Sequence, residues 1–381
     1  MLPDRGNIPA DVILCGVFIF LLMSVITLGR KGRGTGFSEA VAKYACRMFF
    51  LLASYLCLRN VDVLLHFSLR YLRWDVYHDL VTVLVGNLNG GNYYNFFIYF
   101  VDVYVAFCVF LTFPYLYWLE RRIPVSRDRY VNLLRTLMSL PGVLRKRTMH
   151  WNAESRLGLM TILVKVFFVP LMVSWSINNF VHLKNSTLAF HWNIYFVNAY
   201  LVALFIFVDT VIFATGYLVE LPQLDNEIKS VEPSLLGWLV CLWCYPPFNI
   251  FSFRPFDYCI IRTGMECPVW AHVVLTCIIT LLWGIFVWSS IALGFKASNL
   301  TNRGIVREGP YRYVRHPAYT AKLLIWIIQG IFFSQFGVLI LLGFVIVYAL
   351  RAWTEERHLS LDPDYLSYCR AVKWRFLPGI I

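Results

Sequence analysis

Charged residues are scarce in this sequence. They make up 15% of its 381 residues, whereas a soluble domain usually has about 25%. Hydrophobic residues supply 59% of the chain, and the mean hydropathy is +0.62. This balance excludes a soluble multidomain enzyme, a disordered chain, a coiled coil and a disulfide scaffold. It predicts a polytopic membrane protein.

Acidic residues are the scarcer of the two charge types. The chain has 22 acidic and 34 basic residues, which gives a formal net charge of +12. In a membrane protein such an excess usually gathers in cytoplasmic loops, so we expect no nucleic-acid partner. The basic residues concentrate in the stretches 30–47, 120–156 and 294–317. The positive-inside rule therefore predicts that these stretches are cytoplasmic, with the N-terminus outside and the C-terminal tail inside.

A metal-binding pattern is also missing. Cys241 and Cys244 form a CxxC pair, but no second pair and no nearby histidine completes a zinc site. Most of the ten cysteines lie in apolar stretches, where a free cysteine behaves as a small hydrophobe. We therefore expect no metal site.

Nine apolar segments are candidates to cross a bilayer, which takes roughly 20 helical residues. The first lacks a small-residue cleavage site and precedes basic residues, so it is not a cleaved signal peptide. Backbone groups in a membrane must be satisfied internally, which favours helices. We predict an all-α bundle of about eight or nine transmembrane helices with a cytoplasmic C-terminal cap. The segments are 11–29, 48–67, 96–119, 157–180, 193–219, 235–253, 270–293, 318–333 and 336–353.

Three stretches have special features. Tyr245-Pro246-Pro247 interrupts 235–253, and because two prolines remove two backbone donors, this segment is predicted to be kinked or re-entrant. Ser334-Gln335 joins the last two segments, which predicts a tight antiparallel hairpin. The basic loop 120–156 carries leucines among its basic residues, which predicts an amphipathic interfacial helix.

Ionisable residues also lie in or near the predicted spans. Such residues are costly in a bilayer and often functional. A transporter would use them, but the chain shows no pair of broken helices in matching halves. We therefore favour pairing across helices, or snorkelling near helix ends. The residues are Arg59, Asp62, Asp102, Lys165 and Asp209.

The densest group of polar and aromatic residues lies near the C-terminus. Pro317 fits the first turn of a helix, so His316 and Tyr319 are predicted at a cytoplasmic helix start. The hairpin that follows returns the chain to the same end, where it carries Glu355 and Glu356. This convergence is typical of a site for a polar, charged and partly aromatic ligand beside the membrane.

The order of these motifs resembles the isoprenylcysteine carboxyl methyltransferase family, whose wider superfamily includes the phospholipid N-methyltransferases. The Arg-His-Pro motif alone is a weak signal, whereas the whole series with a hairpin inside it is specific. The similar stretch covers less than a third of the chain. In this sequence the family pattern reads Gly309-Pro310-Tyr311, Arg315 to Ala321, Arg351 with Glu355-Glu356, Tyr365 with Tyr368, and Leu377-Pro378-Gly379.

The resemblance implies S-adenosylmethionine as methyl donor and Arg351 as the residue that holds the acceptor carboxylate. It also implies a methyltransferase-like core over 235–381, preceded by N-terminal transmembrane helices over 1–234. The family often has His where Arg303 stands and Gly where Ala321 stands. The implied cofactor contacts are Arg303, Gly304, Ile305, Val306, Tyr311, His316, Pro317, Ala318, Tyr319 and Glu355.

Elementary chemistry agrees with this interpretation. A carboxylate is ionised at neutral pH and needs no general base to accept a methyl group from a sulfonium, so positioning does most of the work. Arginine grips a carboxylate with two hydrogen bonds, and Glu355 suits the donor's ribose hydroxyls or ammonium. We expect the donor to enter from the cytoplasm. A lipid-like or prenylated acceptor would enter from the bilayer, past Trp243, Tyr245 and Pro246-Pro247.

Other reactions and function classes stay open. N-methylation of a lipid amine or S-methylation of a thiol would give Arg351 another role. Membrane sterol reductases bind NADPH at a similar hairpin, but their pattern usually has Asn and Gly-Asp where this chain has Ala318 and Ala321-Lys322. A non-catalytic transporter or scaffold would use the basic C-terminal cluster as a lipid headgroup site.

Overall fold

The structure is a computed structural model that describes residues 43, 44, 46, 129–146, 152–218, 220, 224–245, 268–333 and 338–379. Residues 1–81 with 89–166 form one compact unit, and residues 82–88 with 167–381 form the other. The predicted spans at 11–29, 48–67 and 96–119 lie outside the described residues.

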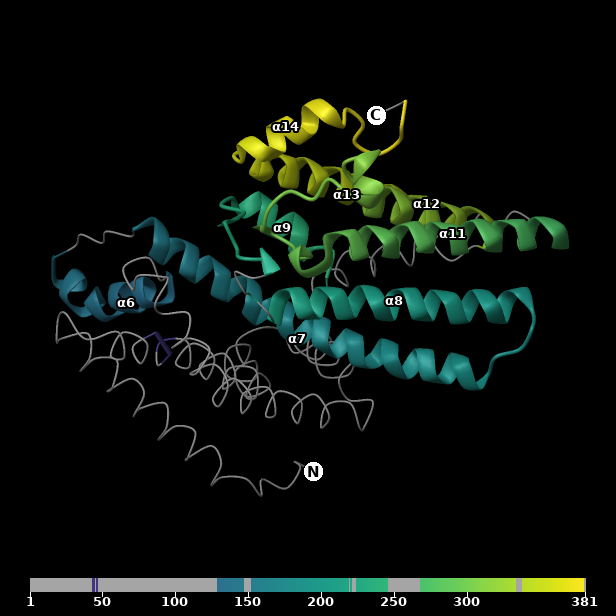
Figure 1. Ribbon diagram of the computed structural model, residues 1–381, viewed down its shortest axis with the longest axis horizontal. Coiled ribbons are helices and arrows are strands. Elements are labelled where there is room, and N and C mark those ends of the chain that lie inside the picture. The colour runs from purple at the N-terminus through teal and green to yellow at the C-terminus, as the bar shows by residue number, and fades with distance from the viewer. Residues whose placement is uncertain are drawn as a thin grey trace, which may run out of the picture. The chain divides into compact units, whose positions relative to one another are not determined.

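The described residues are mainly helical, as predicted, with one short antiparallel ladder (Figure 1). The strands are β1 (Ser230–Val231) and β2 (Thr301–Asn302). Two 3-10 turns are η3 (Gly294–Lys296) and η4 (Gly309–Arg312). The α-helices are α6 (Arg129–Lys146), α7 (Ala153–Leu188), α8 (Ile194–Leu218), α9 (Leu235–Leu242), α11 (Val269–Leu293), α12 (Pro317–Phe332), α13 (Val338–Leu359) and α14 (Pro363–Ala371).

In the first unit, α6 packs closely against the start of α7. Leu133 and Leu134 of α6 are buried, and a Cβ added at Gly158 of α7 would lie 2.7 Å from the Arg129 carbonyl oxygen. The hydroxyls of Thr136 and Ser155 are hydrogen-bonded at 2.8 Å. The helix predicted within 120–156 is therefore present, and these two leucines are buried within the chain rather than exposed on an outer face.

In the second unit, two of the described helices are long and apolar enough to cross a membrane. They cover Ile194–Leu218 and Val269–Lys296 and correspond to the predicted segments 193–219 and 270–293. α12 is a shorter apolar helix. The number of transmembrane helices in the whole chain stays a prediction.

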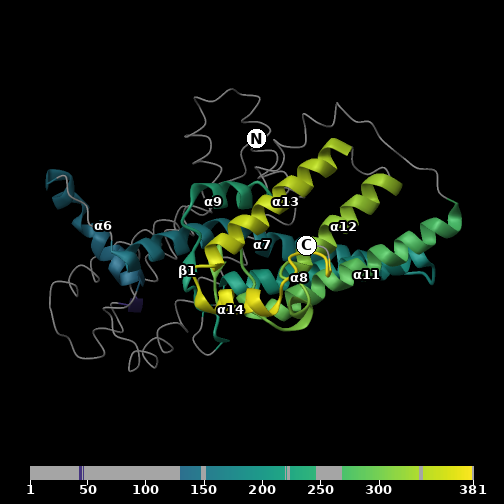
Figure 2. The same cartoon turned by 90° about the horizontal axis from the view of Figure 1, so that it is seen from above.

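α11 lies between α8 on one side and α12 on the other, and α13 runs beside α12 (Figures 1 and 2). Polar side chains inside the apolar helices meet across the α8–α11 contact. Ser290 donates to an Asp209 carboxylate oxygen at 2.5 Å, and the Asn198 amide donates to the Thr280 hydroxyl at 2.5 Å. Such bonds satisfy polar groups that lipid cannot solvate, in agreement with the structural role favoured for Asp209.

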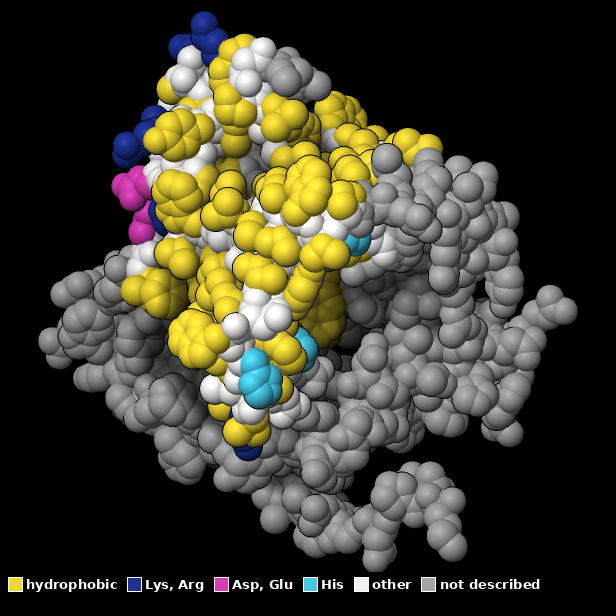
Figure 3. Space-filling model, turned by 90° about the vertical axis from the view of Figure 1, so that its right-hand side faces the viewer, with side chains coloured by type: hydrophobic (Ala, Val, Ile, Leu, Met, Phe, Trp, Pro, Cys, Tyr) yellow, Lys and Arg dark blue, Asp and Glu magenta, His cyan; other side chains and the backbone are white. Residues whose placement is uncertain are grey.

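The outer faces of these helices are apolar. Figure 3 shows one face of the molecule, where hydrophobic side chains cover most of the described surface and the charged ones gather at its edge. The large exposed apolar residues of α11 include Val269, Trp270, Leu281 and Ile291. A helix that is apolar on its outer side as well as its inner side suits a lipid environment.

The segment predicted over 235–253 is not one continuous helix. Ser234 caps α9, because its side chain accepts a hydrogen bond from the Gly237 backbone N–H at 3.1 Å. The helix ends at Leu242, and residues 243–245 form a turn and a bend. The break predicted around Tyr245 is therefore present, while Pro246 and Pro247 lie outside the described residues.

A tight polar junction ties together the end of α8, the segment that follows α8 and the loop after α11. Arg303 is 2% exposed, and its guanidinium donates to the carbonyl oxygens of Gly216 at 2.7 Å and Asn226 at 3.1 Å. The Tyr217 hydroxyl accepts two hydrogen bonds from Asn299, from the backbone N–H at 2.5 Å and from the side-chain amide at 2.7 Å. Because these bonds join three separate segments, the loop after α11 is held in one position.

The C-terminal residues form a cap on the start of α12. The backbone N–H groups of Arg315 and His316 donate to the carbonyl oxygens of Trp374 and Arg375 at 3.0 and 2.8 Å. α14 packs through a small core of Tyr365, Tyr368 and Val372. The charge pattern predicts that this cap is cytoplasmic, and this location stays a prediction.

The contact at Gly216 predicts a strong size limit. A Cβ added there would lie 2.4 Å from the Ala297 carbonyl oxygen, which is backbone and cannot easily move. We expect Gly216→Ala to lower the free energy of unfolding by about 1–3 kcal/mol, measured by thermal unfolding in detergent. Gly343→Ala is the matched control, because its Cβ meets nothing within 4 Å and alanine favours a helix by up to about 1 kcal/mol. Equal losses in both variants would contradict the prediction.

Candidate active site

The α12–α13 hairpin brings the predicted polar residues together at one end. The Tyr319 hydroxyl donates to a Glu355 carboxylate oxygen at 2.7 Å. The His316 Nε2 atom lies 3.0 Å from Glu356 Oε1, and the rings of His316 and Tyr319 are stacked with centroids 5.4 Å apart. The predicted approach of Glu355 and Glu356 to His316 and Tyr319 is therefore confirmed.

Glu356 is buried and is the centre of an ion cluster. In addition to His316, its carboxylate lies 3.3 Å from Arg315 Nη1 and 3.0 Å from Arg375 Nε. Burial raises the pKa of Glu356, but the hydrogen bond with His316 and the charges of Arg315 and Arg375 outweigh this effect and hold the pKa below its usual range. Glu356 thus joins α13 to the start of α12 and to the C-terminal tail.

A partly open cavity of about 420 Å³, open solvent included, lies beside this cluster. Three residues predicted for the site line it, namely Arg351, Tyr319 and Glu355. α13 also contributes Thr354, His358 and Leu359. The adjacent residues Glu355 and Glu356 therefore differ in role, because one reaches the cavity and the other holds the cap.

Arg351 is buried and surrounded by aromatic rings. Its guanidinium carbon lies 5.3 Å from the ring centre of Tyr319, 5.5 Å from that of Tyr245 and 5.9 Å from that of Tyr348. Its Nη2 atom donates to the Asn299 side-chain oxygen and lies 3.5 Å from the Tyr245 hydroxyl. Among the described residues, Arg351 thus has only neutral hydrogen-bond partners.

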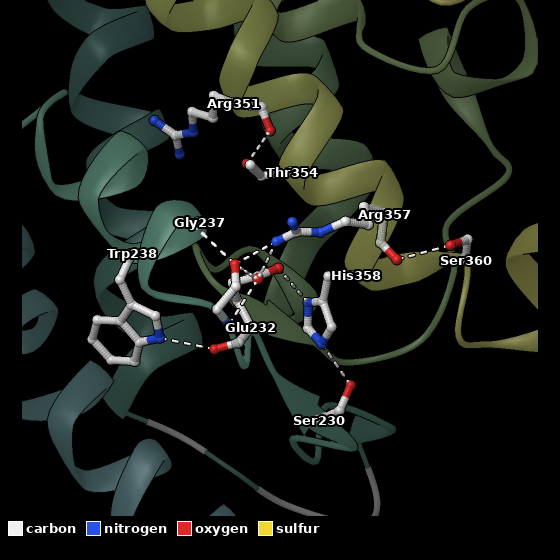
Figure 4. Close-up of polar contacts among 10 residues, drawn as sticks. Ser230, Glu232, Gly237, Trp238, Arg351, Thr354, Arg357, His358 and Ser360 are labelled. Carbon is white, nitrogen blue, oxygen red and sulfur yellow. Dashed lines mark hydrogen bonds and ion pairs between the residues drawn. The ribbon is translucent and has the colours of Figure 1, made fainter.

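The opposite wall of the cavity contains residues that sequence reasoning missed. The loop after α11 contributes Ser298 to Leu300, and β2 contributes Thr301. Gly237 and Cys241 come from α9, and Glu232 comes from the loop before α9. Figure 4 shows Glu232 facing α13 across this region. No motif marks Asn299 or Glu232. The available signal was the position of Glu232 two residues before Ser234, which caps α9.

Arg303 and Gly304 support the loop and are absent from the lining of this cavity among the described residues. Arg303 is occupied with the carbonyl groups described above. Gly304 has a φ of +98°, and its N–H donates to the Asn302 side-chain oxygen at 2.8 Å. A side chain at Gly304 would be strained in this conformation. The predicted cofactor contacts of both residues stay predictions.

The remaining predicted contacts also lie away from the cavity lining as the structure describes it. Ile305 and Tyr311 pack against the small core of the cap, and the Tyr311 carbonyl accepts a hydrogen bond from Tyr368 at 2.7 Å. Pro317 is buried as the first residue of α12, while Val306 and Ala318 are partly buried. Burial raises the pKa of Tyr311 and Tyr368, which keeps both phenols protonated.

The fold and the cavity place a buried guanidinium and a carboxylate at one end of a hairpin of apolar helices. Residues 269–361 match the model of the isoprenylcysteine carboxyl methyltransferase (ICMT) family. This match confirms the resemblance of the C-terminal region, and with the two membrane-capable helices it supports a membrane methyltransferase.

No match was found among curated proteins or solved structures. The family match covers α11, α12 and α13, and thus Asn299, Tyr319, Arg351 and Glu355. Three other lining residues, Glu232, Gly237 and Cys241, lie before the matched residues.

The Glu356 cluster predicts a pH-dependent stability. Because its pKa in the folded protein is lower than the ordinary value of about 4.3, its stabilising effect is present above that pH and is lost as the pH falls through the lowered value. We expect Glu356→Gln to lower the free energy of unfolding at pH 7 by about 1–3 kcal/mol and to weaken the acid dependence. Thermal unfolding as a function of pH measures both, with the exposed Glu308→Gln as control. An unchanged acid dependence in Glu356→Gln would refute this role.

Proposed function

We propose that the chain is an integral membrane methyltransferase that uses S-adenosylmethionine and methylates a carboxylate on a lipid-like or prenylated acceptor. The observation that carries this proposal is the buried Arg351 in the cavity beside Glu355. The family match of residues 269–361 supports the same class of reaction.

The surroundings of Arg351 favour an anionic ligand. Burying a guanidinium without a counter-charge is costly. Among the described residues, the partners within hydrogen-bond distance are the neutral side chains of Asn299 and Tyr245. A ligand carboxylate would accept two parallel hydrogen bonds from the planar guanidinium, which none of these neutral partners does.

The other side chains of the cavity fit the methyl donor. S-adenosylmethionine carries a methyl group on a positively charged sulfur, which makes that methyl group electrophilic. Glu355 lines the cavity and offers carboxylate oxygens to hydroxyl or ammonium groups. The ring of Tyr319 lies in the same wall, and aromatic faces attract cations. The residues present are therefore compatible with this donor.

In this reaction the site would act by positioning the acceptor carboxylate against the methyl group of the donor. Arg351 would hold the acceptor carboxylate through one edge and leave an oxygen lone pair aimed at the methyl carbon. That oxygen forms the new O–C bond as the S–C bond breaks, and the products are a methyl ester and S-adenosylhomocysteine. No proton moves, so the site needs no general base. Fixed orientation of the two partners supplies most of the rate gain.

The two substrates would reach the site from different phases. The donor is water-soluble, and the charge pattern predicts that the capped end of the hairpin faces the cytoplasm. A lipid-like acceptor would enter from the bilayer past Tyr245, whose ring lies against Arg351. Trp243 is exposed in the same turn after α9. The prenyl chain of such an acceptor is apolar and would remain in the lipid while the carboxylate of the cysteine that carries it reaches Arg351.

The first test is binding of the donor. We expect labelled S-adenosylmethionine to bind the detergent-purified chain saturably, and Glu355→Gln to weaken this binding about tenfold or more, because a charge-assisted hydrogen bond is lost. Equilibrium dialysis measures both, with Glu308→Gln as control. Displacement of the label by NADPH, or no saturable binding, would favour the reductase or non-catalytic class instead.

The second test is the role of Arg351. We expect Arg351→Lys to lower kcat/KM for methylation of a short prenylated cysteine by about 100-fold, because lysine keeps the charge but loses the planar fork. Donor affinity should change less than about twofold. Release of the labelled methyl group as methanol by mild base identifies a methyl ester. The exposed Arg312→Lys is the matched control. A base-stable product would show N-methylation or S-methylation and overturn the assignment of the acceptor carboxylate.

A further inference from the structure

Glu232 is a second carboxylate in the cavity wall, and it lies outside the residues that match the family. It is 2% exposed. Its Oε1 atom accepts hydrogen bonds from the Ser234 backbone N–H at 3.0 Å, from the Ser234 hydroxyl and from Arg357 Nη2 at 2.8 Å. One oxygen of the carboxylate is therefore fully engaged with the protein (Figure 4).

The other oxygen, Oε2, is buried and has no hydrogen-bond partner among the residues that the structure describes. His358 lies close to this oxygen, and its Nδ1 atom is 4.0 Å from Oε2. The Nε2 atom of His358 is hydrogen-bonded to the Ser230 hydroxyl at 2.9 Å, and burial lowers the pKa of His358, which favours the neutral ring. A buried carboxylate oxygen in this state lacks a donor, and leaving it so is costly.

The structure holds Glu232 firmly in this position. The Trp238 indole N–H donates to the Glu232 carbonyl oxygen at 2.8 Å, and the β1–β2 ladder anchors the preceding residues. A Cβ added at Gly237 would lie 2.4 Å from Glu232 Cγ, so α9 accepts the side chain only because residue 237 is glycine. This support orients the carboxylate before any ligand binds, as binding sites with high affinity require.

We infer that Glu232 Oε2 binds the ammonium group of the amino-acid part of the methyl donor, so that the segment before α9 completes the donor site from outside the family core. The inference rests on the proposed function. The donor carries two cationic groups, a sulfonium and an ammonium, and the cavity has two carboxylates, Glu355 on α13 and Glu232 on the facing wall. An ammonium group supplies the donor hydrogen that Oε2 lacks.

The test is the affinity of the full-length protein in detergent for two probes, S-adenosylmethionine and S-adenosylhomocysteine, measured by isothermal titration calorimetry. Both keep the ammonium, but only the first has the sulfonium charge. We expect Glu232→Gln to weaken both by about tenfold or more. Glu227→Gln is the matched control, because Glu227 is an exposed carboxylate in the same segment. It should leave both affinities unchanged.

A second variant keeps the inference testable if Glu232→Gln does not fold. Glu232→Asp keeps the negative charge for Arg357 but withdraws the carboxylate by one methylene, and it should weaken both probes in the same direction. Thermal unfolding verifies that each variant is folded.

The outcomes separate the two proposals. If the wild type binds neither probe, the proposed function fails and the inference fails with it. If the wild type binds both probes and the Glu232 variants bind them equally well, only the inference fails. If the variants lose affinity for S-adenosylmethionine alone, Glu232 faces the sulfonium and the ammonium assignment is overturned.

Discussion

The register of the α12–α13 hairpin depends on one buried carboxylate. Glu356 meets His316, Arg315 and Arg375, and an ionised group in this environment is stable only when these partners are in place. Consecutive residues of a helix point about 100° apart, so the register that places Glu356 in the cap turns Glu355 toward the cavity. The geometry of the candidate site is thus set by an electrostatic requirement outside it.

The charged groups of the cavity, unlike Glu356, are not fully paired within the described part of the protein. Among the described residues, Arg351 is buried with neutral hydrogen-bond partners, and one oxygen of Glu232 is buried without a donor. Unsatisfied buried charge lowers stability, and the ligands proposed above would complete these interactions. Two sets of contacts offset the free-energy cost of these unsatisfied groups by holding the surrounding backbone. One is the ion cluster around Glu356, and the other is the pair of hydrogen bonds from Arg303 to the carbonyl oxygens of Gly216 and Asn226.

Several elements were predictable because their causes are local. Apolar length indicated α8 and α11, proline at the first helical position indicated the start of α12, and the short connection indicated the hairpin. The motif residues Tyr319, Arg351 and Glu355 reach one cavity as predicted. Arg303 shows what such reasoning leaves out. Its guanidinium donates to backbone carbonyl groups that are distant in sequence, and no local pattern encodes these bonds, while its predicted cofactor contact stays a prediction.

The sequence by itself determined the helical membrane class, the hairpin and the family of the C-terminal region, since hydrophobic length, turn residues and ordered motifs are properties of short stretches. Only the tertiary structure decided which of two adjacent glutamates faces the cavity and which carboxylate stands opposite it. Glu232 lies more than a hundred residues before Arg351 and Glu355, and it belongs to the same site because β1 pairs with β2 and Arg357 reaches its carboxylate. Long-range contacts of this kind depend on packing, which sequence patterns of helical period do not contain.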